Sequence, residues 1–424
     1  MEQIEAAMNA KYLSKILKTP VEKVTVTFGS NPGDNYMCVI YGLEAELASG
    51  EKKNLVIKAY PNQPARQQML EMSNIFLKEF VVYDFWIPAF KKIQGSQGSI
   101  KLSVPPYLDG AAIDNTKTTE ESRAEPKVDK SNEEFRLENF LLMEDIRLSG
   151  FKMANRLKGL DAHHCRLVLT ELGKFHALEM MDSFKPVMES LMSASDKMVG
   201  ESFGTDSDIY IHYKKFAEND TVETMRIFLE YQLYDMDNIE SFLRVKTEFP
   251  ANFEKGPWLT TCHGDCWVNN FLFRYNEDGS KPEEVCLLDF QLMREACPTT
   301  DLAYFIYTSV DGPTRTKHLK DFLKLYHDTF AATCDQLGVE TMPGFNYESL
   351  LIRFRQAKIF GMMISLPLLF AVLKNPEKAE DLDTLELDNV GDIFAKGMNL
   401  NDENFLLRHR LSEVIQELYD DGVF

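Results

Sequence analysis

Three residues in the second half of the chain have the types and the spacing needed to transfer a phosphoryl group. Asp265 and Asn270 lie five positions apart in the segment TTCHGDCWVNNFLF, and Asp289 follows in LLDF. The first carboxylate would accept the proton of a substrate hydroxyl group, while Asn270 and Asp289 would hold Mg²⁺ against the phosphates through oxygen ligands. A polar turn that caps a hairpin is the plainer alternative, but the combined spacing favours the catalytic interpretation.

A β-hairpin is expected to bring these groups together. After Asn270, the segment FLFRY predicts a strand, NEDGSKP a turn, and EEVCLLDF a second strand that contains Asp289. With the centre of the hairpin near Gly279, we expect Asn270 and Asp289 to pair across the ladder, with Asp265 near the same point. Zinc binding by Cys262, His263 and Cys266 is a weaker alternative, because no second ligand pair appears nearby at a recognisable spacing.

A lysine at the end of an earlier strand predicts the nucleotide side of the site. Lys58 ends the strand-like segment LVIKAY, as the lysine does in the V-A-I-K strand of kinases, where it binds the α- and β-phosphates. Glu79, on the apolar helix that follows, can face the cleft and fix this lysine, and Glu71 is its rival. Gly33, in FGSNPGDNYM, would belong to the phosphate-covering loop, although this segment is not G-x-G-x-x-G and also suits a plain turn between strands.

The segments HGDCWVNN and LLDFQ resemble the ecdysteroid kinase-like family, also called CHK kinase-like proteins. That family is related to aminoglycoside and choline kinases and shares the protein-kinase-like fold. Further segments follow the family's order over nearly the whole chain, namely GDNYMCVIY, LVIKAYP, FLKEFVVYDFWIP, LLMEDI, LGKFHAL and DFQLMREACPTTDLAYF. The resemblance implies an ATP-dependent and Mg²⁺-dependent kinase that transfers the γ-phosphoryl group to a hydroxyl group of a small molecule.

The resemblance also implies roles for residues outside the three-residue constellation. Backbone groups from Met143 to Asp145, in ENFLLMEDI, would form the hinge and bind adenine. His263 would be structural, and Asp301, in TTDLAYF, would brace the catalytic loop. Cys38 stands where the family often has a serine, which puts a hydroxyl–phosphate contact in doubt.

The order of the elements indicates an α+β protein with two lobes. Strand-like segments dominate the first third of the 424 residues, and helical patterns dominate the remainder. With the resemblance, this predicts a protein-kinase-like two-lobe fold with an N-lobe at 1–142 and a helical C-lobe at 143–424 that holds the catalytic loop and the acceptor pocket. The polar stretch at 114–135 is expected to be a surface insertion.

Composition limits the partners and the compartment. A net charge of −20 argues against nucleic acid or an anionic membrane surface as the main partner. The longest apolar run, residues 359–373, is too short to cross a bilayer and contains Pro367. Seven scattered cysteines and an N-terminus without an apolar signal region favour a reducing, cytoplasmic location, and no obligate protein partner is inferred.

The acceptor is expected to be a small molecule. Only eleven residues separate Asp289 from Asp301, without an A-P-E motif, so there is little chain to dock a peptide. A set of apolar residues either packs the core or lines a pocket for a lipophilic, ecdysteroid-like or xenobiotic alcohol: Phe354, Phe360, Met362, Met363 and Phe370. Acids that would attract a choline-like or aminoglycoside-like cation keep that alternative open: Glu413, Glu417, Asp420 and Asp421. A catalytically silent relative that only binds nucleotide or ligand is the other alternative.

Overall fold

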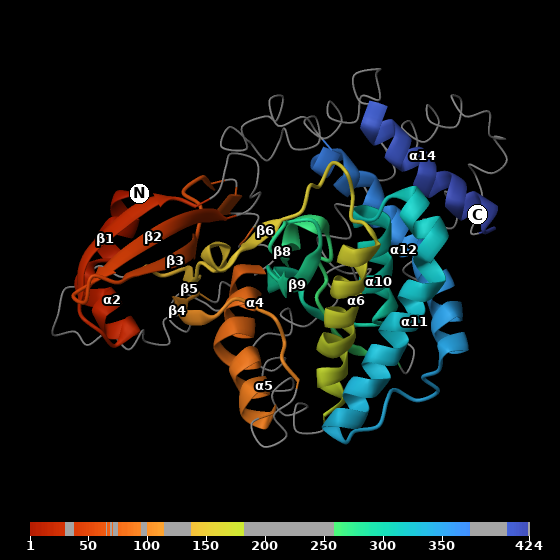
Figure 1. Ribbon diagram of the computed structural model, residues 1–424, viewed down its shortest axis with the longest axis horizontal. Helices are drawn as coiled ribbons and strands as arrows, with labels where there is room; N and C mark the ends of the chain where they lie inside the picture. The colour runs from red at the N-terminus through yellow and green to blue at the C-terminus, as the bar shows by residue number, and fades with distance from the viewer. Residues whose placement is uncertain are drawn as a thin grey trace.

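A computed structural model gives the fold (Figure 1). It describes residues 1–29, 38–64, 66–67, 70, 75–94, 100–113, 137–181, 258–373 and 405–422. Some predicted features lie outside these residues: Gly33, Glu71, the insertion at 114–135, and the side chains of Met363 and Phe370.

An antiparallel five-stranded sheet forms the N-terminal part of the molecule, with the order β1–β2–β3–β5–β4. Its strands are β1 (Val21–Phe28), β2 (Val39–Leu47), β3 (Lys52–Ala59), β4 (Tyr107–Ala111) and β5 (Phe140–Glu144). Alternate residues of β2 are buried, as expected for a sheet with one covered face. Two short helices, α1 (Glu2–Ala7) and α2 (Ala10–Leu17), share a core with this sheet through Ile4 and Leu13.

A helical segment lies between this sheet and the rest of the molecule (Figure 1). It consists of α4 (Ile75–Val81), a π-helical stretch (Val82–Trp86) and α5 (Ile87–Gln94). The helix predicted after β3 is therefore confirmed, with a π-helical insertion that the apolar spacing did not indicate. Phe76 and Tyr83 are buried in the larger of the two hydrophobic cores.

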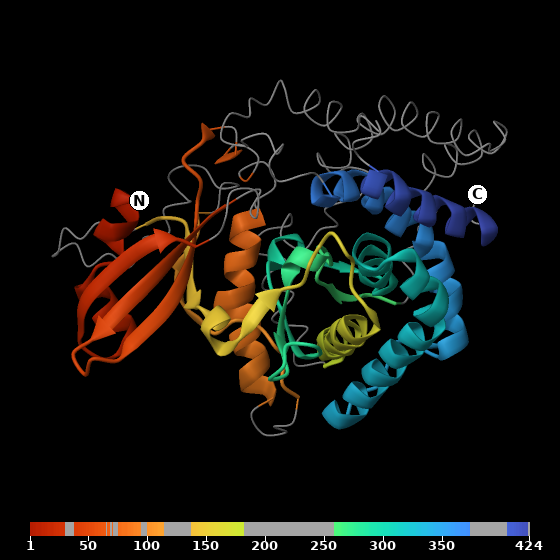
Figure 2. The same ribbon diagram turned by 45° about the horizontal axis from the view of Figure 1, so that its top comes forward.

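The remainder of the described chain is mostly helical, with small sheets that carry the loops of the candidate site (Figure 2). The small sheets are β6 (Phe151–Met153) with β8 (Phe271–Tyr275) and β9 (Pro282–Leu287), and β7 (Thr260–Cys262) with β10 (Arg294–Ala296). The helices are α6 (Ala162–Ala177), α10 (Thr299–Ser309), α11 (Gly312–Leu337), α12 (Tyr347–Leu373) and α14 (Phe405–Asp420). None of the helices in the described residues has the length and apolar character needed to cross a membrane.

The arrangement confirms the predicted α+β class, with a sheet before a helical region. The division after residue 142 stays a prediction. It falls inside β5, whose Met143 and Glu144 still pair with Val56 and Leu55 of β3.

The predicted hairpin is present, but its pairing differs by one residue from the expectation. Phe271 pairs with Leu287, and the backbone N–H of Leu288 donates to the carbonyl oxygen of Asn270 at 2.9 Å. Asn270 therefore lies opposite Leu288, and Asp289 is the next residue beyond the ladder. A register shift near Tyr275 changes the pairing close to the turn, so counting outward from the turn gave the wrong partner.

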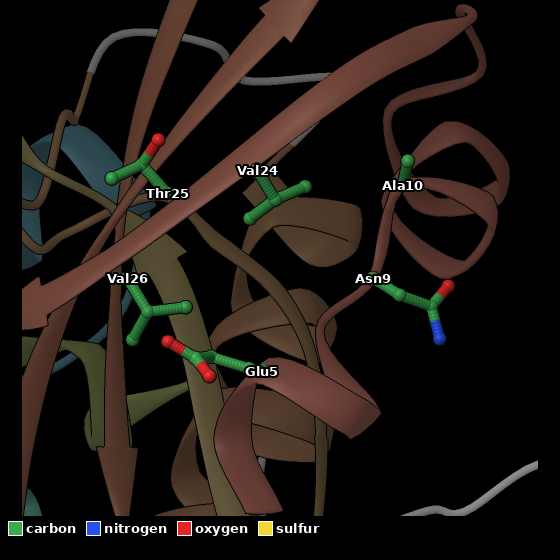
Figure 3. A pocket seen from close by; sticks show the side chains of 6 residues that line it. All are labelled: Glu5, Asn9, Ala10, Val24, Thr25 and Val26. Carbon is green, nitrogen blue, oxygen red and sulfur yellow. The ribbon is translucent and has the colours of Figure 1, made fainter. Parts of the chain in front are cut away.

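A hollow lies on β1, the outer strand of the large sheet (Figure 3). Val24 and Val26 of β1 line it together with Glu5 and Asn9. Because β1 is two strands away from β3 in the sheet order, this hollow does not border Lys58 at the end of β3.

Candidate active site

The loop after β7 depends on a glycine. Gly264 has a φ of +83°, and a Cβ atom added to it would lie 2.0 Å from the carbonyl oxygen of Leu292 and 2.7 Å from Nη1 of Arg294. A side chain is therefore excluded by the backbone conformation and by the neighbouring turn. The sequence pattern HGD marks this position without revealing why a glycine is needed there.

Asp301, at the start of α10, holds this loop. Its carboxylate accepts the backbone N–H groups of His263, at 2.6 Å, and of Gly264, at 3.0 Å. Nε2 of the buried His176 lies 3.1 Å from the same carboxylate. Burial acts to raise the pKa of Asp301, but the hydrogen bond and charge of His176 outweigh it and lower this pKa to about 2. Asp301 is therefore an ionised anchor for the loop.

His263 is fully buried and joins two parts of the site. Its Nε2 lies 2.8 Å from the carbonyl oxygen of Leu288, and its Nδ1 accepts the backbone N–H of Asp265 at 3.3 Å. These partners require a neutral ring with the proton on Nε2. The histidine thus connects the loop at Asp265 with the residue next to Asp289.

Asp265 is buried, and each of its carboxylate oxygens has a donor. Tyr304 donates its hydroxyl hydrogen to Oδ1 at 2.7 Å, and Asn270 donates from Nδ2 to Oδ2 at 2.9 Å. Burial and then the negative charge of Asp289 raise the pKa of Asp265 above its ordinary value. Tyr304 is a site residue that the sequence does not indicate, because its spacing in an apolar helix is also that of a core residue.

Asn270 and Asp289 offer the oxygen atoms that a magnesium ion requires. The amide nitrogen of Asn270 donates to both the carbonyl and the side chain of Asp265, each at 2.9 Å, so its oxygen is the atom left to face a cation. Asp289 adopts a left-handed backbone with a φ of +61°, which is uncommon outside glycine and most accessible to Asn and Asp. An amide oxygen and a carboxylate suit Mg²⁺, so these residues fit the predicted ion.

Lys58 connects the large sheet to this centre. Its Nζ lies 2.5 Å from Oε2 of Glu79 on α4 and 3.1 Å from Oδ1 of Asp289. Burial acts to lower the pKa of Lys58, but the charges of Asp289 and Glu79 outweigh it and raise this pKa well above its usual value. Burial raises the pKa of the Glu79 carboxyl, against the opposing charge of Lys58. The structure thus brings three residues from three distant segments into one ion-paired group.

Near Lys58, Cys38 provides a thiol where the family often has the hydroxyl group of a serine. Cys38 immediately precedes β2 and is buried near the charges of Lys58 and Glu79. Burial raises the pKa of its thiol to about 12, so the group stays neutral. The backbone carbonyl of Cys38 accepts a hydrogen bond from the buried guanidinium of Arg66 at 3.2 Å.

Backbone N–H groups at the predicted hinge already have partners. That of Glu144 donates to Pro106 at 2.9 Å, and that of Asp145 donates to Asn54 at 3.0 Å. The side chain of Asp145 caps the next short helix and is ion-paired with Arg147 at 2.7 Å. Adenine contacts between Met143 and Asp145 remain a prediction, which would rely on carbonyl oxygens rather than on these two N–H groups.

A possible metal-donor set beneath the loop differs from the one considered in the sequence. His176, Cys262 and Asp301 place one donor atom each within 4.8 Å of one another, whereas His263 and Cys266 are not part of this set. The donors are already hydrogen-bonded, because Cys262 donates to the carbonyl oxygen of Ala296 at 3.5 Å and the other two bind each other. Buried hydrogen bonding is sufficient to account for this cluster.

Comparison with known proteins identifies the chain. The model of the ecdysteroid kinase-like family matches residues 32–339, about three quarters of the chain. No curated protein sequence matches it.

Solved structures of small-molecule kinases are also similar. An ethanolamine kinase of Plasmodium vivax is 10% identical, with 94% of this chain and 87% of that chain covered and a TM-score of 0.43. A choline kinase of Streptococcus pneumoniae is 13% identical, with 97% of each chain covered and a TM-score of 0.38. A microcompartment-associated aminopropanol kinase is 10% identical, with 98% and 99% covered and a TM-score of 0.45.

These values are low, so the family match is the finding that identifies the chain. It covers Lys58, Glu79, Asp265, Asn270 and Asp289 together. The chain belongs to the ecdysteroid kinase-like family, which confirms the predicted family and enzyme class, a small-molecule phosphotransferase with an alcohol group as acceptor.

Proposed function

We propose that the protein transfers the γ-phosphoryl group of ATP to a hydroxyl group of a small lipophilic molecule. The observation that carries this proposal is the contact of Lys58 with both Glu79 and Asp289, beside the buried carboxylate of Asp265. A lysine held between two acids at the junction of a sheet and a catalytic loop is the arrangement that positions nucleotide phosphates in kinases.

Asp265 is the proposed base. It takes the proton of the acceptor hydroxyl as the new oxygen–phosphorus bond forms and the bond between the γ-phosphorus and ADP breaks. The raised pKa of this carboxyl brings it closer to neutrality, where a general base is most effective. Asn270 and Asp289 would hold Mg²⁺, which supplies positive charge against the phosphates.

Lys58 is the proposed phosphate-binding residue, and Glu79 would position it. Because Asp289 also contacts Lys58, the ammonium group lies between the acid on α4 and the proposed magnesium ligand. Gly33 and the backbone from Met143 to Asp145 complete the proposed nucleotide site. The intact set argues against a catalytically silent relative, since such proteins commonly lack one of these groups.

The proposed lipophilic acceptor, ecdysteroid-like or xenobiotic, follows from the family of the chain, and one ring of the predicted apolar set lies near Asp265. Tyr304, which contacts Asp265, also contacts the ring of Phe360 on α12, with 6.4 Å between ring centroids. Phe354 and Met362 are buried in the core, so core packing accounts for them without a pocket. Detoxification or storage of such an alcohol in the cytoplasm is the physiological role that we propose.

The acids that would favour a cationic acceptor have other partners in the fold. Glu417 is ion-paired at 2.8 Å with Arg315, which is fully buried. The others bind neighbouring groups: Glu413 accepts the N–H of Gly312, Asp420 accepts from Gln416, and Asp421 pairs with Lys358. These contacts weaken the argument for choline or an aminoglycoside as the acceptor.

A panel of acceptors tests the proposal. The purified protein is incubated with radiolabelled ATP, Mg²⁺ and an ecdysteroid, a plant phenol, choline or an aminoglycoside. Labelling of choline or the aminoglycoside alone would reject the lipophilic acceptor and leave the kinase activity standing. Asp265→Asn and Asp289→Asn are each expected to lower the rate by about 10²-fold or more. Asp278→Asn, on the exposed turn of the same hairpin, is the matched control and should keep the full rate.

A further inference from the structure

Tyr304 lies where one face of α10 meets the catalytic loop. It follows Asp301 by one helical turn, is 4% exposed, and donates its hydroxyl hydrogen to Oδ1 of Asp265 at 2.7 Å. Burial and then the charge of Asp265 raise the pKa of this phenol well above its usual value. The phenol is therefore neutral, and an ionised carboxylate can only accept from it.

Two hydrogen-bond donors restrain the rotation of the Asp265 carboxylate. The torsion about its Cβ–Cγ bond has broad energy minima, so packing alone fixes the carboxylate plane weakly. Tyr304 binds Oδ1 and Asn270 binds Oδ2, and rotation would break both hydrogen bonds. Since the Asn270 amide is also the proposed magnesium ligand, Tyr304 is the donor devoted to the base.

The phenol itself is held firmly. All eleven residues of α10 are buried, and the ring of Tyr304 lies against Phe360 of α12. The first turn of the helix also contains Asp301, which binds the backbone of the same loop. One rigid helix thus fixes the loop backbone through Asp301 and the side chain of the base through Tyr304.

We propose that Tyr304 is a positioning residue, whose hydroxyl group orients the carboxylate of Asp265 toward the acceptor hydroxyl. This inference rests on the proposed function, in which Asp265 is the base. Tyr304 does not take the proton. It holds the carboxylate of Asp265 in the orientation in which one of its oxygens faces the acceptor hydroxyl group.

The main test compares two single-oxygen deletions on the same helix. Tyr304→Phe is expected to lower kcat about tenfold with little change in the KM for ATP. Tyr307→Phe is the matched control, because its hydroxyl is also buried but lies 3.4 Å from Glu417 rather than from the base. The kinase reaction contains ATP, Mg²⁺ and ecdysone. Hydrolysis of ATP, in which water takes the phosphoryl group, is measured in the same samples.

A second measurement does not depend on activity. Tyr304→Phe is introduced alone and together with Asp265→Asn, and each protein is unfolded in urea. The phenylalanine should reduce the folding equilibrium constant roughly tenfold more beside Asp265 than beside the asparagine, because a buried carboxylate left without its donor costs more than a neutral amide oxygen left without one.

The outcomes separate this inference from the proposed function. Wild-type kcat in Tyr304→Phe, or equal effects of the phenylalanine in both backgrounds, would overturn the positioning role. Full activity in Asp265→Asn would instead overturn the proposed base, whatever the behaviour of Tyr304.

Discussion

Replacement of Gly264 by alanine would test how the catalytic loop is held. The left-handed backbone at this position costs an alanine about 1–2 kcal/mol. The new Cβ would also lie 2.0 Å from the carbonyl oxygen of Leu292, so either the loop or the turn after Asp289 must move. We therefore expect a total loss of roughly 3 kcal/mol or more in the free energy of unfolding.

The effect on activity should exceed what lost stability alone would cause. The turn that contains Leu292 follows Asp289, and the loop that contains Gly264 precedes Asp265. A movement of about 1 Å between the two carboxylates is expected to lower the rate about 10²-fold. This loss should persist at temperatures where the variant is fully folded.

Gly279 supplies the matched control. It also has a positive φ, +72°, but no atom lies within 4 Å of the Cβ that an alanine would add. Gly279→Ala should therefore lose only about 1 kcal/mol and keep full activity. Urea unfolding and the radiolabelled-ATP assay measure both variants. Equal midpoints and equal rates for the two alanine variants would refute the proposed clash.

Three other perturbations test further contacts. Lys58→Ala should raise the KM for ATP or abolish turnover, and Glu79→Ala should have a milder effect because it only positions the lysine; equal rates for wild type and both variants would contradict this. The pKa of Asp301 falls from 3.8 to about 2 on folding, so its ionised form stabilises the fold above pH 4. That contribution to the free energy of unfolding, roughly 2 kcal/mol, is lost as the pH falls from 4 to 2. In urea unfolding, Asp301→Asn should not show this decrease between pH 4 and pH 2. Glu417→Ala should lower the free energy of unfolding by about 3 kcal/mol, because it leaves the buried Arg315 without its ion pair; an unchanged urea midpoint would refute this.

Features encoded locally could be predicted from the sequence. The hairpin after Asn270 has two strand-like segments separated by a polar turn that contains Gly279, so the sequence indicates its strands and approximate centre. Lys58 and Glu79 follow each other along the chain in the order of a kinase, and the structure brings them together. The hairpin register was wrong by one residue, because an irregularity near Tyr275 is not visible in the pattern of residue types.

Features that depend on distant partners could not be predicted in the same way. Tyr304 is 39 residues from Asp265, and a buried tyrosine in an apolar helix is indistinguishable from core packing in sequence. In sequence, Glu417 is a possible attraction for a cationic substrate, whereas in the structure it pairs with the buried Arg315, 102 residues away. A carboxylate in the sequence does not show whether its positive partner is a substrate or a basic side chain of the protein itself.

The complete burial of α10 has a consequence for hydrogen exchange. Amide hydrogens in a helix without an exposed residue can exchange with solvent only when the surrounding core opens. The N–H groups of His263 and Gly264 are bonded to Asp301 of this helix, so we expect them to exchange as slowly as the helix itself, although they lie in a loop. Deuterium uptake can therefore report the integrity of the catalytic loop before any acceptor has been identified.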